Sequence, residues 1–453
     1  MGRPVQTFRK TAVFAALALF AVASWSHEET ETRDRETRID RETREDRSGR
    51  EQEERRDSEI RIDNSGSGSI DSGSSGSASS GSDDGRREDR HDRVENGRGS
   101  SARFEVERDT AGRERVRREV LMVADPRSID TVRDAGFTII SARPLTAFGE
   151  TLARIRVRRG RSVEQVISEL QALAPLASIA PHHLFRPSGD EAVATTVESA
   201  PVPVAAANTG HVGVIDTGAD VSWPALKLSI VQTEGFADGG YTSRPHGTLV
   251  AEIIARSGAH LTVADVFGVD SDNRLIAPAA AIASAIDWLV ASGVRVINIS
   301  IEGPDNFVLA HVIKRALAAD VAIVAAAGNG GPAARPAFPA AYPGVIAVTA
   351  VDENGQVYRR ANRGDYIAFA ARGVHVASEY ESATSKAKTV SGTSFASPVV
   401  AAAIARRLEG SAGVGGVIDS LKTEARDLGT PGRDSIYGWG ELAIPQALTA
   451  NSR

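Results

Sequence analysis

Hydrophobic and polar positions divide this chain of 453 residues into stretches of very different character. Between residues 27 and 116, acidic and basic residues alternate, a Gly/Ser tract interrupts them, and apolar residues are almost absent. Such a composition buries too little apolar surface to offset the conformational entropy that folding costs. We therefore expect residues 27–116 to remain an unfolded, solvated tether, with a charged helical stalk over 27–63 as the alternative.

Between residues 117 and 187 the pattern changes to short apolar strands and two amphipathic helices. We expect helices over 125–136, capped by Asp125 or Ser128, and over 162–175, with Val166, Leu170 and Leu173 on the buried side. The expected strands are 118–124, 137–141, 150–157 and 176–181. This order of strand, helix, strand, strand, helix, strand predicts a small α+β ferredoxin-like domain. Residues 188–209, rich in Ala, Pro and Ser, are expected to be a linker.

From residue 210 to 453 the strands read as continuous apolar runs rather than as alternating positions. These runs cover 211–215, 261–267, 294–300, 321–327, 345–350 and 366–370, with small-residue helices between them. Strands of this kind are buried on both faces, so the pattern predicts a doubly wound α/β domain with a mostly parallel sheet. Reactive groups in such sheets gather at the carboxyl ends of the strands.

The first 26 residues form a basic start followed by an apolar run that ends in small residues. Arg3, Arg9 and Lys10 precede the run, and Ala21 and Ala23 form an A-x-A-like cleavage site. This pattern predicts a secretory signal peptide and export to the periplasm or the outside of the cell. The run is short for a membrane span, which needs about 20 residues; retention of the segment as an anchor is the alternative.

Composition excludes several classes of function. The net charge is −6 and no basic excess is present, so nothing indicates binding to nucleic acid. The chain has no cysteine, which excludes disulfides, a thiolate metal site and a cysteine nucleophile.

Four polar residues of the α/β domain lie at ends of predicted strands or helices. Asp216 closes the run 211–215, His246 precedes a helix, Asn329 follows a buried strand on a glycine turn, and Ser394 begins a helix after Gly392 and Thr393. Each has an ordinary explanation as a turn former, a cap or a left-handed residue. Together they supply a hydroxyl nucleophile, a base, a carboxylate that orients the base, and an amide donor for a developing oxyanion.

The order Asp216, His246, Asn329, Ser394 resembles that of the subtilisin-like serine proteases, the subtilases. The blocks VIDTGAD, HGTLVAEII, INISIEGP, AAAGNGG and SGTSFASPVVAAAIA are similar to blocks of that family, over nearly all of 211–450. The segment 118–187 resembles the propeptide of many subtilases. The resemblance implies that Ser394 is the nucleophile, His246 the general base and acid, and Asp216 its orienting partner, with Asn329 in the oxyanion hole.

The resemblance also implies a substrate-binding strand. Ser300, Ile301, Glu302 and Gly303 match the strand that pairs with the substrate backbone, and Ala326 and Gly328 match the opposite wall of the specificity pocket. Glu302 stands where the family usually has glycine. Its carboxylate could favour a basic residue next to the cleaved bond, which we take as the hypothesis, or it could narrow the site.

We expect no metal and no cofactor. The segment after His246 is too short for the calcium-binding loop of many relatives, and Asp270 and Asp272 are more typical of a solvated loop than of a calcium site.

The sequence thus predicts an exported, monomeric serine endopeptidase that acts on proteins or peptides and is made as a self-processing zymogen. Its own propeptide-like domain is the expected partner, and self-cleavage is expected between about residues 183 and 209. One alternative is an inactive subtilase-fold scaffold. Another is an esterase, against which the absence of a G-x-S-x-G elbow around Ser394 and the order of the triad argue. The natural substrate, the cleavage point and the role of residues 27–116 stay open.

Overall fold

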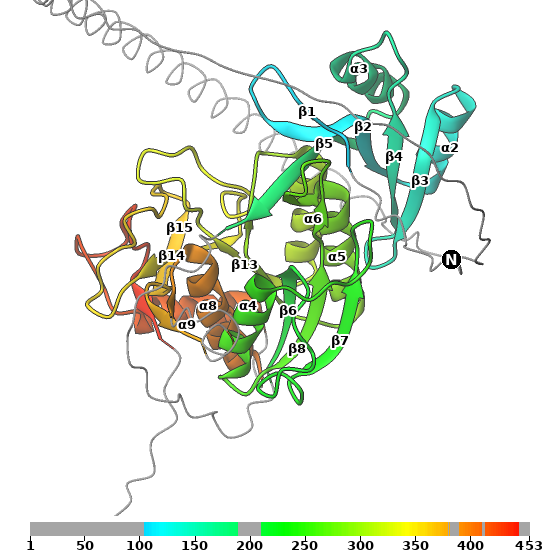
Figure 1. Ribbon diagram of the computed structural model, residues 1–453. Coiled ribbons are helices and arrows are strands. Elements are labelled where there is room, and N and C mark those ends of the chain that lie inside the picture. Colours follow the sequence, from blue (N-terminus) through cyan, green and yellow to red (C-terminus); the bar gives the residue numbers. More distant parts are fainter. Residues whose placement is uncertain (1–103, 189–209, 379, 381–388, 410–412, 444–453) are drawn as a thin grey trace, which may run out of the picture. The chain divides into compact units, whose positions relative to one another are not determined.

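The computed structural model describes residues 104–188, 210–378, 380, 389–409 and 413–443, which belong to one compact unit (Figure 1). The predicted signal peptide at 1–26, the tract 27–103 and the linker residues 189–209 lie outside the described residues. Within the described part of the chain, every helix is too short or too polar to cross a membrane.

The first domain is a ferredoxin-like α+β unit, as predicted. Its sheet has the order β3-β4-β2-β5, all antiparallel, and β1 pairs with β2. The elements are β1 (Val106–Arg108), β2 (Glu114–Ala124), α2 (Pro126–Asp134), β3 (Thr138–Leu145), β4 (Glu150–Arg156), α3 (Val163–Leu173) and β5 (Ser178–Pro187).

Local side-chain chemistry sets both helix starts. The carboxylate of Asp125 accepts the N–H groups of Arg127 and Ser128 at the start of α2, and Ser162 and Gln165 form a capping box at the start of α3. The expectation that Leu173 lies on the buried side is wrong, since it is 39% exposed. Ala174, four residues after Leu170, takes the buried place instead.

The ordered chain begins earlier than the predicted boundary at residue 116. Residues 104–116 include β1 and the start of β2, so the unfolded tract does not extend to 116. The reason is a small apolar cluster in which Phe104 and Val116 pack against Leu184 and Ile276. Composition alone misses it, because its members are far apart in the sequence.

The second domain contains an eight-stranded, entirely parallel sheet, which confirms the predicted α/β class. The strand order is β18-β15-β14-β13-β11-β6-β8-β7. The strands are β6 (His211–Asp216), β7 (Ile230–Gly235), β8 (His260–Asp265), β11 (Val296–Ile299), β13 (Ala322–Ala326), β14 (Ile346–Val351), β15 (Ile367–Arg372) and β18 (Glu441–Leu442). The two edge strands were not predicted, since β7 is largely exposed and polar and β18 has two residues.

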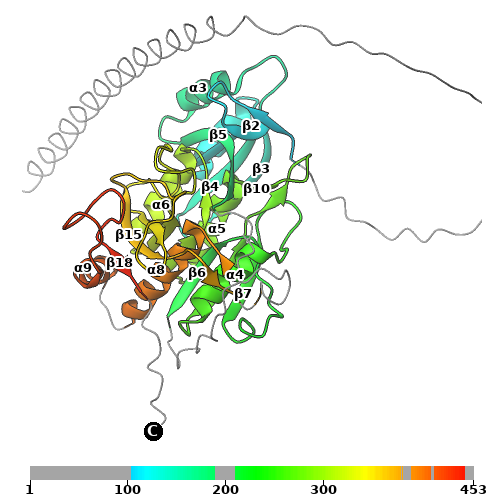
Figure 2. The same ribbon diagram turned by 60° about the vertical axis from the view of Figure 1, so that its left-hand side comes forward.

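Helices cover both faces of this sheet (Figures 1 and 2). Two separate apolar cores lie on the two faces, one formed with α5 (Ala279–Ala291) and α6 (Phe307–Ala318) and the other with α4 (Pro245–Ala255), α8 (Thr393–Leu408) and α9 (Val414–Glu424). This double cover explains why the inner parallel strands are buried and mostly apolar. The short strands are β9 (Gly268–Val269), β10 (Leu275–Pro278), β12 (Ile301–Glu302), β16 (Val376–Ala377) and β17 (Thr389–Val390).

In the small antiparallel sheet, the central strand β2 is also buried on both faces. On β2, Val120 and Met122 face the core with α2 and α3, whereas Leu121 and Val123 belong to the core with α5 and α6. Strand side chains alternate between faces, so one strand serves both cores. Asp287 of α5 adds a polar contact, accepting the N–H groups of Thr146 and Ala147 at 2.9 Å each.

Strand β5 leaves its own sheet and continues into the larger domain. Leu184 and Phe185 pair with β10, and Arg186 and Pro187 pair antiparallel with Glu302 and Ile301 of β12. This extension brings the end of the first domain to the carboxyl-end rim of the parallel sheet.

Candidate active site

Asp216 and His246 meet at the carboxyl end of β6. Asp216 is the last residue of that strand and is fully buried, and His246 lies in the first turn of α4. Nδ1 of His246 lies 2.8 Å and 3.0 Å from the two carboxylate oxygens of Asp216. Because an ionised carboxylate only accepts hydrogen bonds, Nδ1 carries the proton, and Nε2 of the neutral ring is left as the acceptor.

A glycine allows α4 to start this close to Asp216. The N–H of Gly247 donates to the hydroxyl of Thr217 at 2.9 Å. A Cβ on Gly247 would lie 2.0 Å from the carbonyl oxygen of Thr217, which no side chain tolerates. The sequence HGT after the proline therefore lets the helix that carries His246 pack directly on the turn that follows Asp216.

Ser394 lies in the first turn of α8, beside His246. The ring of Phe395 packs at 5.4 Å from the imidazole of His246, centroid to centroid. Oγ of Ser394 and Nε2 of His246 are both buried, and neither has a hydrogen-bond partner among the described residues. Buried polar atoms are normally paired, so two unpaired atoms, one on His246 and one on the residue before Phe395, mark this place as a candidate reactive site.

The other two serines of this segment have structural contacts. Ser391 accepts the N–H of His375 at 3.0 Å, and Ser397 shares a hydrogen bond of 3.2 Å with Ser300. Ser300 also donates to the carbonyl oxygen of Ser394 at 3.1 Å. This carbonyl would bond to the N–H four residues later in a regular helix, but that residue is Pro398, which has none. The hydroxyl of Ser300 replaces it.

The amide of Asn329 has a fixed orientation. Its Oδ1 accepts the N–H of Thr393 at 3.1 Å and the hydroxyl of Thr393 at 3.2 Å. The donor Nδ2 therefore faces the other way, where it donates to Oγ of Ser188 at 3.2 Å. Gly328 makes the turn before Asn329 with a φ of +105°, and a Cβ there would lie 2.5 Å from Asn362.

The predicted substrate strand is paired with the chain's own β5. Besides the pairing of Ile301 and Glu302, the N–H of Ser188 donates to the carbonyl of Ser300 at 3.1 Å. Gly303 packs under the ring of Phe185, where a Cβ would lie 2.3 Å from the ring.

The two expected walls of the pocket are joined by one side chain. Ala326 is buried at the end of β13, and the N–H of Gly328 donates to Thr393 at 3.2 Å. From the opposite strand, Oε2 of Glu302 accepts the N–H of Asn329 at 3.0 Å. The structure thus brings all ten sequence-predicted site residues to one region.

Sequence reasoning missed three residues here. Ser188 was assigned to the linker but is fully buried within the site, and Thr393 contacts Asn329, Gly328 and Ser188. The third is Asp265, which ends β8 and is paired in register with Asp216. The sequence did offer a signal for Asp265, because this aspartate follows an apolar strand segment just as Asp216 does.

Asp265 holds the segment that leads into α4. Its carboxylate accepts the N–H groups of Thr242 at 2.8 Å and Phe267 at 3.0 Å, and Arg244 lies 3.7 Å away. Burial raises the pKa of Asp265 to about 6, with a further increase from Asp216, although the two N–H groups and Arg244 act in the opposite direction.

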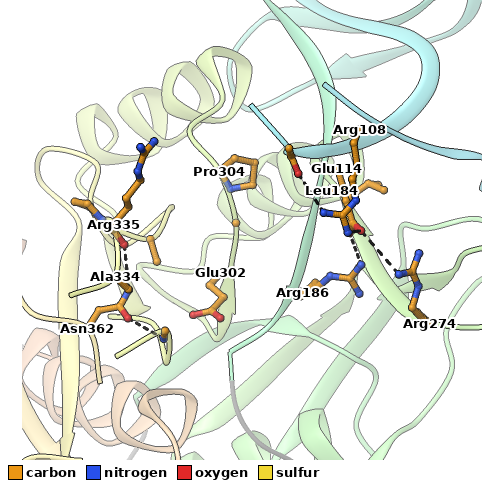
Figure 3. A pocket seen from close by; sticks show the side chains of 15 residues that line it. Arg108, Glu114, Leu184, Arg186, Arg274, Glu302, Pro304, Ala334, Arg335 and Asn362 are labelled. Carbon is orange, nitrogen blue, oxygen red and sulfur yellow. Dashed lines mark hydrogen bonds and ion pairs between the residues drawn. The ribbon is translucent and has the colours of Figure 1, made fainter. Parts of the chain in front are cut away.

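A cavity of about 590 Å³ lies beside the substrate strand (Figure 3). Its lining includes Glu302, Gly303 and Arg335 from the second domain and Glu114 and Arg186 from the first. Glu114 is ion-paired with Arg186 and, at 2.7 Å, with Arg108.

Asp270 is committed to protein contacts. Its carboxylate accepts the N–H groups of Asp272 and Arg274 and pairs with the guanidinium of Arg274 at 2.7 Å. Over the described ranges, no group of three or more His, Cys, Asp or Glu residues is arranged to hold a metal ion.

Comparisons with known proteins agree on one family. Residues 208–440 match the model of the subtilase family. The chain is 35% identical to subtilisin DY of Bacillus licheniformis over 257 residues, which cover 52% of this chain and 89% of that protein. It is 32% identical over 258 residues to the minor extracellular protease Epr of Bacillus subtilis, but this match spans only 38% of Epr.

Two solved structures share the fold. Fervidolysin from Fervidobacterium pennivorans, a keratinolytic enzyme related to subtilisin, aligns with a TM-score of 0.57 and 19% identity over 73% of this chain and 60% of its own. A serine protease of Staphylococcus aureus that processes the epidermin leader peptide aligns with a TM-score of 0.55 and 16% identity over 74% of this chain and all of its own.

Proposed function

Because this chain belongs to the subtilase family, we propose that it is an exported serine endopeptidase that cleaves peptide bonds through an acyl-enzyme intermediate. The observation that carries the proposal is the 2.8 Å contact between His246 and Asp216, together with the unpaired, buried Nε2 of His246 and Oγ of Ser394. The contact with Asp216 holds the imidazole in the tautomer that can accept a proton at Nε2, and the hydroxyl of Ser394 is left without another partner among the described residues.

In the proposed reaction, Nε2 of His246 takes the proton of Ser394 while Oγ forms a bond to the carbonyl carbon of the substrate. Asp216 keeps the imidazole in the productive tautomer and stabilises the imidazolium that forms. His246 then gives the proton to the leaving amine as the peptide C–N bond breaks. In the second half, His246 activates a water molecule that releases the acyl group from Ser394.

Two donors would bind the oxyanion of each tetrahedral intermediate. One is Nδ2 of Asn329, whose orientation Thr393 holds, and the other is the N–H of Ser394 at the positive end of α8. Fixed donors aimed at developing charge reduce the activation free energy by about 3–4 kcal/mol each.

The proposal includes synthesis as a zymogen. The pairing of β5 with β12 supports it, because the end of the first domain lies along the substrate strand as a bound peptide would. In this view the domain 104–188 inhibits the enzyme until the chain cuts itself between about residues 183 and 209. The predicted signal peptide supports export, and the enzyme would act as a monomer.

Labelling with a fluorophosphonate probe, after an added protease has removed the first domain from every variant, tests the catalytic claim. We expect the wild type to be labelled and Ser394→Ala to be unlabelled. Ser391→Ala is the matched control, because the Ser391 hydroxyl accepts the N–H of His375, and it should keep its label. A folded wild type that takes up no probe would support the inactive scaffold instead.

Self-processing has a separate test. When expressed alone, Ser394→Ala should accumulate as the unprocessed chain, whereas the wild type yields a fragment that starts between residues 184 and 210. Normal maturation of the alanine variant would show that another protease does the cutting.

A further inference from the structure

We propose that Glu302 restricts the residue on the amino side of the cleaved bond to a small side chain: serine, alanine or glycine. This inference rests on the proposed endopeptidase function and names its substrate class. The carboxylate of Glu302 on the substrate strand narrows the specificity pocket; it does not create a preference for a basic residue.

The chain's own Ser188 marks the position in question. Its N–H bonds to the carbonyl of Ser300 and so continues the pairing of β5 with β12. Its hydroxyl lies 3.2 Å from Nδ2 of Asn329 and 3.3 Å from the hydroxyl of Thr393, the residue before Ser394. A peptide in this register presents the carbonyl of its last paired residue to the proposed nucleophile.

The side chain at this position has little room. Ser188 is fully buried, and Oε2 of Glu302 lies 3.5 Å from its hydroxyl. The same oxygen accepts the N–H of Asn329 at 3.0 Å. Glu302 therefore reaches from the substrate strand to the opposite wall, across the entrance of the pocket. A larger side chain would have to displace the carboxylate and break a charge-assisted hydrogen bond.

Space for a large side chain does exist beyond Glu302. The cavity of about 590 Å³ is lined on the side of the second domain by Gly303, Gly330 and Ala337 as well as by Glu302 (Figure 3). A shorter residue at position 302 would open the way into it.

The charges of the same cavity argue against a basic preference. Four arginines line it, against the two carboxylates of Glu114 and Glu302, so a lysine or arginine side chain that enters meets an excess of positive charge. Size rather than charge then decides which residue is accepted.

Self-cleavage of the full chain tests the inference through paired substitutions. In the wild-type background, Ser188→Ala should be processed on the carboxyl side of residue 188, whereas Ser188→Leu and Ser188→Arg should be processed there at least about tenfold more slowly. Glu302→Gly combined with Ser188→Leu should restore cleavage at this bond. Mass spectrometry of the intact chains over time gives the cleavage rates, and N-terminal sequencing of the fragments gives the cleavage points.

Glu302→Gln is the matched control, because it keeps the length of the side chain and removes its charge. It should exclude leucine as the wild type does. Glu302→Ala serves as a second opening variant if Glu302→Gly does not fold, as judged by circular dichroism.

The outcomes separate this inference from the proposed function. Cleavage that requires Ser394 but follows the introduced leucine or arginine as fast as the alanine overturns the size restriction and leaves the protease intact. If the wild-type chain cuts itself after a large or basic residue, the size restriction is also overturned. If no cleavage in the wild type depends on Ser394, the proposed self-processing fails, and the inference fails with it.

Discussion

The two large sheets of the described part of the protein both have central strands buried on two faces, yet they use their strand ends differently. In the parallel sheet, the ends of neighbouring strands bring side chains together, among them Asp216 and Asp265. In the antiparallel sheet, one strand, β5, extends beyond its own domain and offers backbone groups to β10 and β12. In the proposed function, the larger domain supplies the reacting groups and the smaller one supplies a strand that lies where a substrate would.

This division of roles predicts which measurements respond to a substitution. Changes at the carboxyl-end rim of the parallel sheet should reduce the rate of the chemical step or alter the stability of the rim. Changes at the contact between the domains should alter how firmly β5 occupies the site and leave the chemistry unchanged.

Asp216→Asn should have the largest effect. The carboxamide can offer an N–H to Nδ1 of His246, which favours the wrong tautomer, and it no longer stabilises an imidazolium. We expect kcat for a peptide substrate to fall by about 10⁴-fold with the fold preserved. A loss of less than tenfold would remove Asp216 from the reaction. Asp220→Asn is a suitable control, because among the described residues its carboxylate bonds to the N–H and the hydroxyl of Ser222.

Asn329→Ala should reduce kcat by about 10²–10³-fold, the usual cost of one oxyanion donor. KM should change little, because the donor acts on charge that forms only in the transition state. If KM instead rises by about 10²–10³-fold and kcat is unchanged, Asn329 binds the substrate in its ground state.

Asp265 should make stability depend on pH. Its pKa is raised from the ordinary 3.8 to about 6, so its protonated form is favoured by the folded state. The stability that this group contributes is fully present below about pH 4 and is lost as pH rises through 6, by up to about 3 kcal/mol.

Urea unfolding of Asp265→Asn checks this, in a Ser394→Ala background that prevents autolysis. Relative to the aspartate chain, the asparagine chain should gain stability between pH 4 and pH 8. A difference that stays constant over this range would mean that Asp265 is ionised in the fold at its ordinary pKa.

Asp287→Ala should have the smallest effect and should spare the chemistry. It leaves the N–H groups of Thr146 and Ala147 without their acceptor, which costs about 1–3 kcal/mol. In the Ser394→Ala background we expect hydrogen exchange to quicken in β5 and β12, with Asp272→Ala, on an exposed loop, as the control. Unchanged exchange would show that the contact between the two domains is stabilised by the apolar contacts of Leu121 and Val123 and not by Asp287.

Sequence reasoning found the parallel sheet and proposed four candidate site residues because both leave local signals. Continuous apolar runs identify buried strands, and Asp216, His246, Asn329 and Ser394 each stand in a recognisable block. Ser188 and Thr393 left no such signal. They lie 205 positions apart, and their contact depends on how β5 crosses between the domains.

The same limit explains the wrong start of the ordered chain. Phe104 stands within a charged segment, and its burial depends on Leu184 and Ile276, which no local window includes. Leu173 shows the opposite error. It continues the apolar pattern of the helix at 162–175, but the helix ends at this residue and its side chain is exposed.

Trapping of the acyl-enzyme tests the central claim most directly. The matured protein is mixed with p-nitrophenyl acetate, quenched in acid and digested for mass spectrometry. The account predicts a burst of nitrophenol equal to the enzyme concentration and a single acetyl group on Ser394. An acetyl group on another residue, or a folded enzyme that hydrolyses peptides without any adduct on Ser394, would contradict it.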